Sequence, residues 1–121
     1  MRQVFQDVVL DDAPVESYVF DASSGSARLD VDLADERRAS FIFEGVIGVR
    51  QVPSVEFDRG RLYIDGVYCR SVVEVQDSEW IATIVTAAKA QGGPVPTKIQ
   101  HYIVPSDDWV WEIVARDCRR E

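Results

Sequence analysis

The stretch SEWIATIVTAAKAQGG, residues 78–93, is the one segment of this 121-residue chain with a clear helical pattern. Apolar residues recur in it at spacings of one, three and four, as on one face of an amphipathic helix: Trp80, Ile81, Ile84, Val85 and Ala88. Asp77 or Ser78 can cap the first turn, and Gly92, Gly93 and Pro94 end the helix. We therefore predict one main helix from Ser78 to Gln91, with the rest of the chain forming a sheet wrapped on it.

The rest of the chain is rich in β-branched and aromatic residues, which predict strands. The predicted strands span residues 4–10, 15–21, 27–33, 39–52, 98–104 and 109–117, with shorter ones between. Strict alternation of apolar and charged residues over 27–33 is typical of an antiparallel strand with one wet face. In the long segment 39–52 four apolar residues share one phase, and Gly45 and Gly48 indicate a bulge or bend. The four are Phe41, Phe43, Ile47 and Val49.

Tight turns connect these strands. Asp65-Gly66 between apolar runs predicts a two-residue hairpin that pairs Ile64 with Val67 and Tyr63 with Tyr68. Residues 58–60 predict a three-residue hairpin and residues 11–14 a further turn, while residues 118–121 are expected to fray. The sequence thus predicts a single α+β domain, residues 1–121. Its sheet is mostly antiparallel and strongly curved, with about seven to nine strands and one main helix.

The last two predicted strands flank a turn at residues 105–108 and form a closing hairpin. A four-residue turn would place Val104 opposite Trp109, Tyr102 opposite Trp111, and His101 opposite Glu112. Both faces of this hairpin are largely apolar, so we expect it to lie centrally in the sheet or to meet a partner with one face. Tyr102, Trp109 and Trp111 share a face, which fits either a core position or an exposed aromatic interface.

Composition and charge exclude several classes of protein. No run of about 18 apolar residues is present, which argues against a membrane span. The N-terminus lacks the pattern of a signal peptide, so we expect a cytoplasmic protein with Cys69 and Cys118 reduced. The net charge of -8 repels nucleic acid and suits a basic protein partner, although it also serves solubility.

The sequence contains no motif that indicates a catalytic, cofactor or metal site. A single histidine and two isolated cysteines make a zinc site improbable, and the acidic cluster at residues 30–36 lacks the glycine of a calcium loop. Cys69 is expected to be a small core residue. His101 opposite Glu112 is a polar pair that fits either a cross-strand contact or an oriented base, but the sequence supplies no nucleophile beside it.

Two segments, FIFEGVIGVRQVPS at residues 41–54 and HYIVPSDDWVWEIVARD at residues 101–117, carry a family resemblance. They resemble small bacterial proteins, some of which in turn resemble immunity proteins encoded beside polymorphic toxins. The residues that fit the pattern are Phe43, Gly45, Val46, His101, Tyr102, Asp108, Glu112, Ile113, Val114 and Ala115. The resemblance implies a non-enzymatic cytoplasmic domain that binds one protein.

Three functions remain open at this stage. The first is a non-enzymatic protein-binding module, such as an acidic immunity-type inhibitor of a basic partner. The second is a homodimeric structural or accessory domain that uses the aromatic hairpin or an exposed strand edge. The third is a small-molecule binder or enzyme with His101 and Glu112 in the wall of a pocket.

Overall fold

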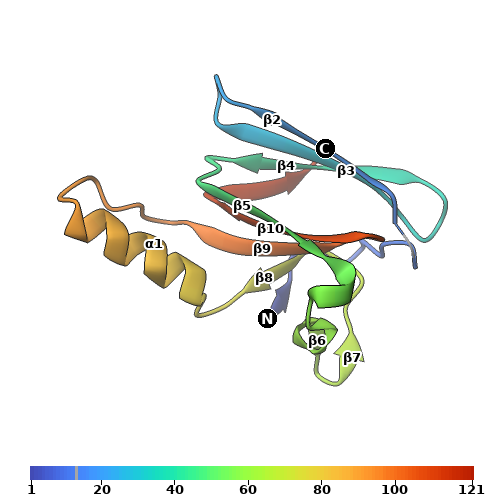
Figure 1. The fold of residues 1–121 in the computed structure, drawn as a ribbon. Coiled ribbons are helices and arrows are strands. Elements are labelled where there is room, and N and C mark those ends of the chain that lie inside the picture. The colour runs from blue at the N-terminus through green and yellow to red at the C-terminus, as the bar shows by residue number, and fades with distance from the viewer. Residues whose placement is uncertain (13) are drawn as a thin grey trace.

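Two antiparallel sheets, a short hairpin and one α-helix make up residues 1–12 and 14–121, which the computed structural model describes (Figure 1). The strands are β1 (Arg2–Gln3), β2 (Glu16–Asp21), β3 (Ser26–Asp32), β4 (Arg38–Glu44), β5 (Gly48–Pro53), β6 (Tyr63–Ile64), β7 (Val67–Tyr68), β8 (Val73–Val75), β9 (Gln100–Pro105), β10 (Trp109–Ala115) and β11 (Asp117–Arg120). One sheet has the order β1-β8-β9-β10-β5 and the other β11-β4-β3-β2, while β6 pairs with β7.

This architecture confirms an α+β fold with antiparallel pairing and one main helix. The prediction of a single strongly curved sheet of seven to nine strands is wrong, because the described residues form eleven strands divided between separate sheets. Alternation in the sequence specifies which side chains share a face, but it does not reveal where a sheet ends.

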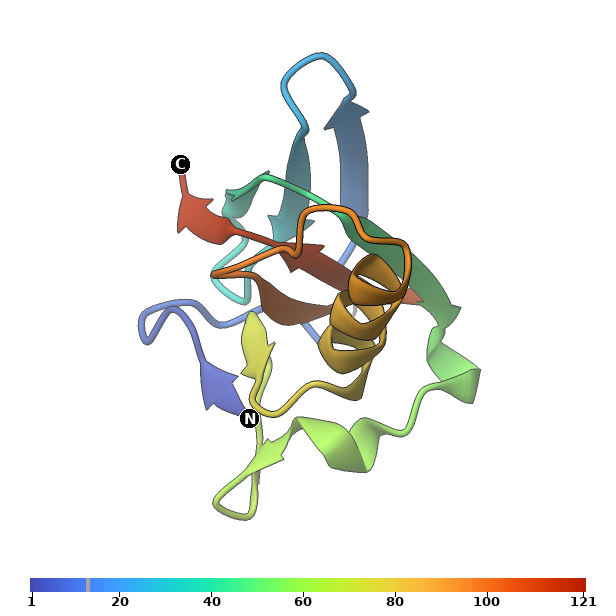
Figure 2. The ribbon, with the colours of Figure 1, turned by 90° about the vertical axis from the view of Figure 1, so that its left-hand side faces the viewer.

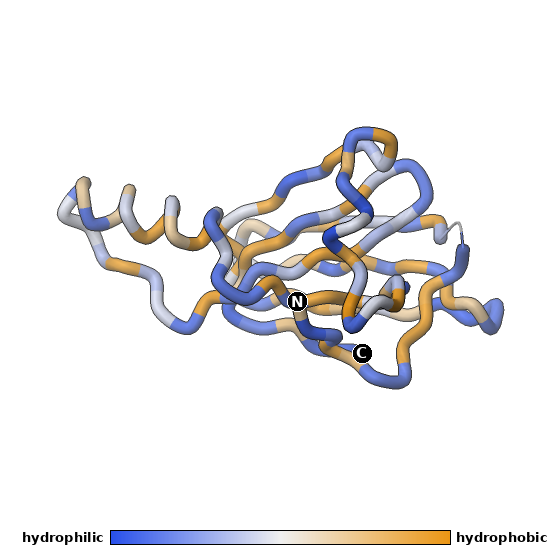
Figure 3. Tube along the Cα trace, turned by 90° about the horizontal axis from the view of Figure 1, so that it is seen from below, coloured by the Kyte–Doolittle hydropathy of each residue, from blue (hydrophilic) through white to orange (hydrophobic). Residues whose placement is uncertain are grey.

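The hydrophobic core lies between the two sheets. Ala27, Leu29 and Val31 of β3 are buried in alternation, as the sequence predicts. They belong to one apolar cluster with Phe41 of β4 and Ile113 of β10, so residues from both sheets fill the same space. Seen from below, hydrophobic and hydrophilic stretches alternate along the strands, and the helix extends away from them (Figure 3). The closing hairpin β9–β10 lies in the middle of its sheet, as predicted.

The predicted long strand 39–52 is two strands in different sheets. Gly45 has φ 64° and ends β4, and a Cβ at this position would lie 3.0 Å from the Cβ of Arg116. The predicted bend at Gly45 is therefore confirmed, but the shared phase is not. Phe41 is buried, whereas Ile47 and Val49 are exposed, because the chain changes sheets between them. The C-terminal segment also passes from one sheet to the other, since β10 pairs with β5 and the following strand β11 pairs with β4.

The Asp65-Gly66 hairpin has the predicted register, with Ile64 paired to Val67 and Tyr63 to Tyr68. The hairpin predicted at residues 58–60 is wrong. Two 3-10 helices, η1 (Ser54–Glu56) and η2 (Arg59–Leu62), occupy this region, and the Asp58 side chain accepts a hydrogen bond from the Gly60 amide. A side chain that bonds the backbone locally competes with strand pairing, which explains the difference.

The two chain ends also differ from prediction. Residues 4–10 form no strand. The N-terminal β pairing of residues 1–10 consists of the short β1, at residues 2–3, and an isolated bridge between Leu10 and Leu33. Residues 118–121 are not frayed, because β11 pairs with β4 and buries Cys118. The turn predicted at residues 11–14 includes Ala13, which lies outside the described residues.

Helix α1 (Glu79–Ala90) begins after Ser78, whose side chain accepts from the Ile81 amide at 3.2 Å, and Gly92 follows its end with φ 68°. Both caps agree with the sequence prediction. The stripe of Trp80, Ile81, Ile84, Val85 and Ala88 is only half-buried, and no helix residue is fully buried. The prediction that the sheet wraps on this helix is therefore wrong, since α1 projects from the sheets between β8 and β9 (Figures 1 and 2).

Candidate functional site

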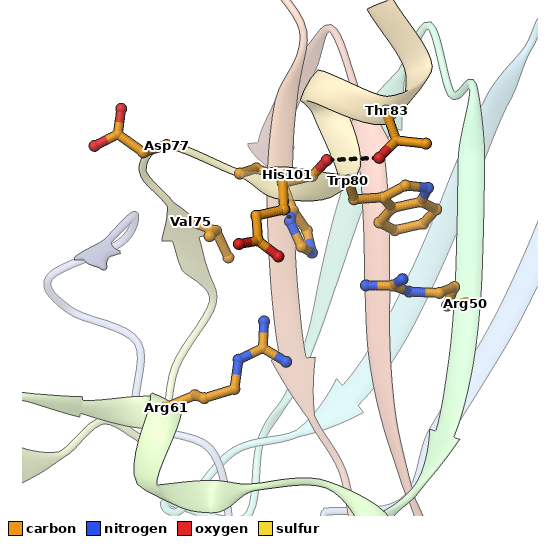
Figure 4. A pocket seen from close by; sticks show the side chains of 9 residues that line it. Arg50, Arg61, Val75, Asp77, Trp80, Thr83 and His101 are labelled. Carbon is orange, nitrogen blue, oxygen red and sulfur yellow. Dashed lines mark hydrogen bonds between the residues drawn. The ribbon is translucent and has the colours of Figure 1, made fainter. Parts of the chain in front are cut away.

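A cavity of about 580 Å³ lies where the first turn of α1 meets the outer face of the five-stranded sheet (Figure 4). Side chains from five elements and their connections reach it, so it exists only in the folded chain. The lining residues are Arg50, Arg61, Val75, Asp77, Ser78, Glu79, Trp80, Thr83 and His101.

The structure brings His101 and Glu112 together at this place. His101 Nε2 lies 2.8 Å from Glu112 Oε1, and both side chains are only 3% exposed. The predicted register is nevertheless wrong, because His101 pairs with Val114 and Glu112 with Ile103. A shift of two residues keeps every side chain on its predicted face, so the two polar groups still meet diagonally across the strands. His101 lines the cavity, whereas Glu112 lies behind it.

Ser78 adds a third polar group that the sequence did not associate with this pair. Its Oγ lies 2.8 Å from His101 Nδ1 while it also caps α1. The sequence identified Ser78 as a helix cap but gave no sign of its neighbour. The contact depends on the path of the chain from β8 into α1, which local pattern does not determine.

Two arginines complete the surroundings of Glu112. Arg50 Nη2 lies 3.1 Å and Arg61 Nη2 3.7 Å from Glu112 Oε1, and in Figure 4 both guanidinium groups point toward the space beside His101. Burial by itself would raise the pKa of Glu112, but hydrogen bonds from His101 and Arg50 outweigh it and lower this pKa below its ordinary value. Glu112 is therefore ionised at neutral pH.

Trp80 fixes the first turn of α1 to the sheet. Its ring lies edge-on to the His101 ring with centroids 5.3 Å apart, and the Arg50 guanidinium stacks 4.0 Å from its centroid. Gly48 permits this contact, because a Cβ at that position would lie 2.9 Å from Trp80 Cζ2. The polar groups of the cavity are thus held by packing as well as by hydrogen bonds.

The predicted aromatic interface residues are mostly in the core. Tyr102 is buried against Phe43 with ring centroids 5.6 Å apart, and Trp111 is buried and stacked on Tyr18 at 4.7 Å. Trp109 is half-buried at the end of the hairpin. Tyr102 and Trp111 therefore offer no surface to a partner in this fold, because they face the opposite sheet.

The two cysteines are free and buried. Burial raises the pKa of the Cys69 thiol and raises that of the Cys118 thiol to about 12, so both are poor nucleophiles. Among the described residues, no group of three or more histidine, cysteine or acidic side chains is placed to hold a metal ion. Nor is any described helix both long and apolar enough to cross a lipid bilayer.

A second place of interest is the acidic loop end, which we define as the loops around residues 11–12, 14–15, 53–58 and 105–109. Backbone hydrogen bonds join these loops, from Asp107 N to Pro14 O at 2.9 Å and from Ser54 N to Asp108 O at 2.8 Å. Its exposed carboxylates are those of Asp11, Asp12, Glu56, Asp58, Asp107 and Asp108. Val55 lies among them with 95% of its surface exposed, and Val15 is exposed as well.

No protein-family model, curated protein or solved structure matches this chain.

Proposed function

We propose that this chain is a protein-binding module that docks a basic partner on the acidic loop end, in the manner of an immunity-type inhibitor. The observation that carries the proposal is the exposure of Val55 among carboxylates. Covering an apolar side chain that is 95% exposed removes apolar surface from water, which favours binding of a partner at this place.

Charge supports the same surface. Asp12 pairs with Arg70, but Asp11, Glu56, Asp107 and Asp108 form no ion pair with any described residue. Their charge is thus available to attract a basic surface, and such complementarity raises the association rate and favours one orientation. The net charge of -8 acts in the same direction.

The loops are also fixed in place before binding. The Ser54 hydroxyl donates to Asp107 O at 2.7 Å, in addition to the backbone bond between Ser54 and Asp108. The Val15 amide donates to Asp32 Oδ2 at 3.2 Å. A surface that is already ordered loses less conformational entropy on binding, which favours affinity.

A charge-matched pair of variants tests this proposal. The test variant carries Glu56→Gln, Asp107→Asn and Asp108→Asn, and the control carries Asp21→Asn, Asp65→Asn and Asp117→Asn on other exposed positions. Each loses three negative charges, which changes the net charge from -8 to -5. We expect the wild type and the control to retain one basic protein from a lysate of the native host at low salt, and the test variant to lose it.

The captured protein is then purified and titrated against each variant by calorimetry. We expect at least about a tenfold weaker Kd for the test variant than for the control, which corresponds to about 1.4 kcal/mol. Equal affinity for all three proteins, or no specific partner at any salt concentration, would contradict the proposal.

A homodimer is the second candidate, and the edge strand β2 favours it. Among the residues that the structure describes, β2 pairs with β3 alone, so its outer edge can pair with the β2 of a second copy. Phe20 is exposed on it beside Ile47 and Val49, and Val19 is exposed on the opposite face of the strand. Sedimentation at high protein concentration tests this candidate. We expect the wild type to form a dimer and Phe20→Ser to dissociate it. A wild type that stays monomeric would exclude a homodimer.

A further inference from the structure

Three polar groups beside the cavity, the half-buried Ser78 and the buried His101 and Glu112, form a directed chain of hydrogen bonds. The Glu112 carboxylate can only accept, so His101 Nε2 carries the proton of their 2.8 Å contact. In the neutral imidazole His101 Nδ1 is then an acceptor, and the Ser78 hydroxyl donates a hydrogen bond to it across 2.8 Å. The Ile81 amide donates to one Ser78 lone pair, which leaves the other free.

This order matches the roles in a nucleophile–base–carboxylate arrangement. A hydroxyl becomes a nucleophile when a neighbouring base takes its proton, and a buried carboxylate orients the base and stabilises its protonated form. The Glu112 carboxylate also lies 3.1 Å from Arg50 Nη2 and 3.7 Å from Arg61 Nη2. The imidazole is reversed relative to the common arrangement, with Nδ1 toward the hydroxyl. Either ring nitrogen can accept a proton when it is the unprotonated one.

The helix provides donors for a developing negative charge. The Ile81 amide is occupied by Ser78 Oγ and the Ala82 amide by Ser78 O at 3.1 Å. The amides of Glu79 and Trp80 precede them and have no intrahelical partner, as at the start of any helix. Backbone amides at a helix N-terminus stabilise an oxyanion. Ser78 also lines the cavity, which provides room for a small substrate.

We propose that Ser78 is the nucleophile of an acyl-transfer site that hydrolyses small carboxylic esters. Ser78 Oγ attacks the ester carbonyl carbon while His101 Nδ1 takes the hydroxyl proton. The ester C–O bond breaks and the proton passes to the leaving alkoxide, which gives an alcohol and an acyl-serine. Water then attacks the acyl-serine with the same base, which releases the carboxylic acid and restores the Ser78 hydroxyl.

The cavity wall suits a substrate without strong net charge. Arg50 and Arg61 contribute positive charge, and Asp77 and Glu79 contribute negative charge. The sequence predicted that His101 and Glu112 lie together but indicated no nucleophile beside them. Ser78 comes within hydrogen-bond distance of His101 only in the folded chain. The non-enzymatic character expected from sequence remains a prediction, and this proposal is its alternative.

Labelling with diisopropyl fluorophosphate tests the nucleophile directly. We expect peptide mass spectrometry to find the label on Ser78 of the folded wild type, well above the background on the exposed Ser24. Ser78→Asn is the matched variant, because asparagine also caps helices but carries no hydroxyl. His101→Gln is expected to slow labelling by about 10² to 10⁴. Circular dichroism establishes that each variant is folded.

Hydrolysis of p-nitrophenyl acetate provides the second readout, and we expect Ser78→Asn to reduce its rate to that of exposed nucleophiles. Ser78 labelled no faster than Ser24, or equal hydrolysis by the wild type and Ser78→Asn, would overturn the proposal and leave the three residues as an anchor for α1. That result would not affect docking at the acidic loop end, because the variants that test docking keep Ser78, His101 and Glu112.

Discussion

The two faces of the hairpin β9–β10 are both buried, but they are stabilised in different ways. The inner face carries apolar and aromatic side chains, such as Val104 and Ile113, that pack against the other sheet. The outer face carries Ile103 and Val110 in a second apolar cluster and, beside them, the buried pair His101 and Glu112.

This difference separates non-directional from directional stabilisation. Apolar burial on the inner face depends on area and fit, so it tolerates changes of partner as long as the volume is kept. The outer polar pair depends on Ser78, Arg50 and Arg61, which come from three other parts of the chain. A buried charge that loses its partners costs more than the intact pair contributes, so this face is the more specific of the two.

Phe41→Ala is expected to have the largest effect, because it removes a fully buried ring from the inner cluster. We expect the free energy of unfolding to fall by about 4 kcal/mol in urea denaturation, from lost transfer energy and a residual cavity. Phe20→Ala is the control, since Phe20 is 46% exposed, and it should cost less than about 1 kcal/mol. Similar losses for both would mean that the inter-sheet space is not the main core.

Glu112→Gln is expected to cost about 3 kcal/mol at pH 7, because it leaves the groups around the carboxylate without their charged partner. The folded-state pKa of Glu112 lies below its ordinary value of 4.5, so its stabilisation is complete above that pH and is lost as the pH falls through the folded pKa. Urea titrations across this range should show the difference between wild type and variant shrinking in acid. A difference that is constant with pH would mean that the carboxylate charge contributes nothing.

Gly48→Ala tests the packing of α1 on the outer face. The added Cβ would lie 2.9 Å from Trp80 Cζ2, so Trp80 has to move, and we expect a loss of about 1 to 2 kcal/mol. The indole N–H resonance of Trp80 should shift in the NMR spectrum. Gly93→Ala is the control, because a Cβ there meets nothing within 4 Å. An unchanged Trp80 resonance in Gly48→Ala would contradict the contact.

Ser78→Ala should have the smallest effect, about 1 kcal/mol, through loss of the helix cap. Ser78→Asn retains a capping oxygen and should remain within a few tenths of a kcal/mol of the wild type. Amide hydrogen exchange in the first turn of α1 measures both, with faster exchange expected for alanine alone. Equal acceleration in the two variants would show that the contact with His101, and not the cap, holds this turn.

Features that depend on neighbouring residues could be predicted from the sequence. The Asp65-Gly66 turn and the caps of α1 follow from local backbone chemistry, and the structure has both. The faces of β9 and β10 were also predictable, because alternation has a period of two residues. The register of β9 and β10 was not predictable from alternation. A shift of two residues keeps the same alternation, so the two registers differ only in the length of the turn.

The sequence by itself determined the α+β class, the helix and its caps, and the presence of His101 and Glu112 on one face. Only the tertiary structure decided that the helix projects from the sheets, that the chain changes sheets after Gly45, and that Ser78 reaches His101. The physical reason is that local patterns fix the state and face of each segment. Contacts between distant segments depend on how sheets end, stack and connect, and an alternating pattern is compatible with many such arrangements.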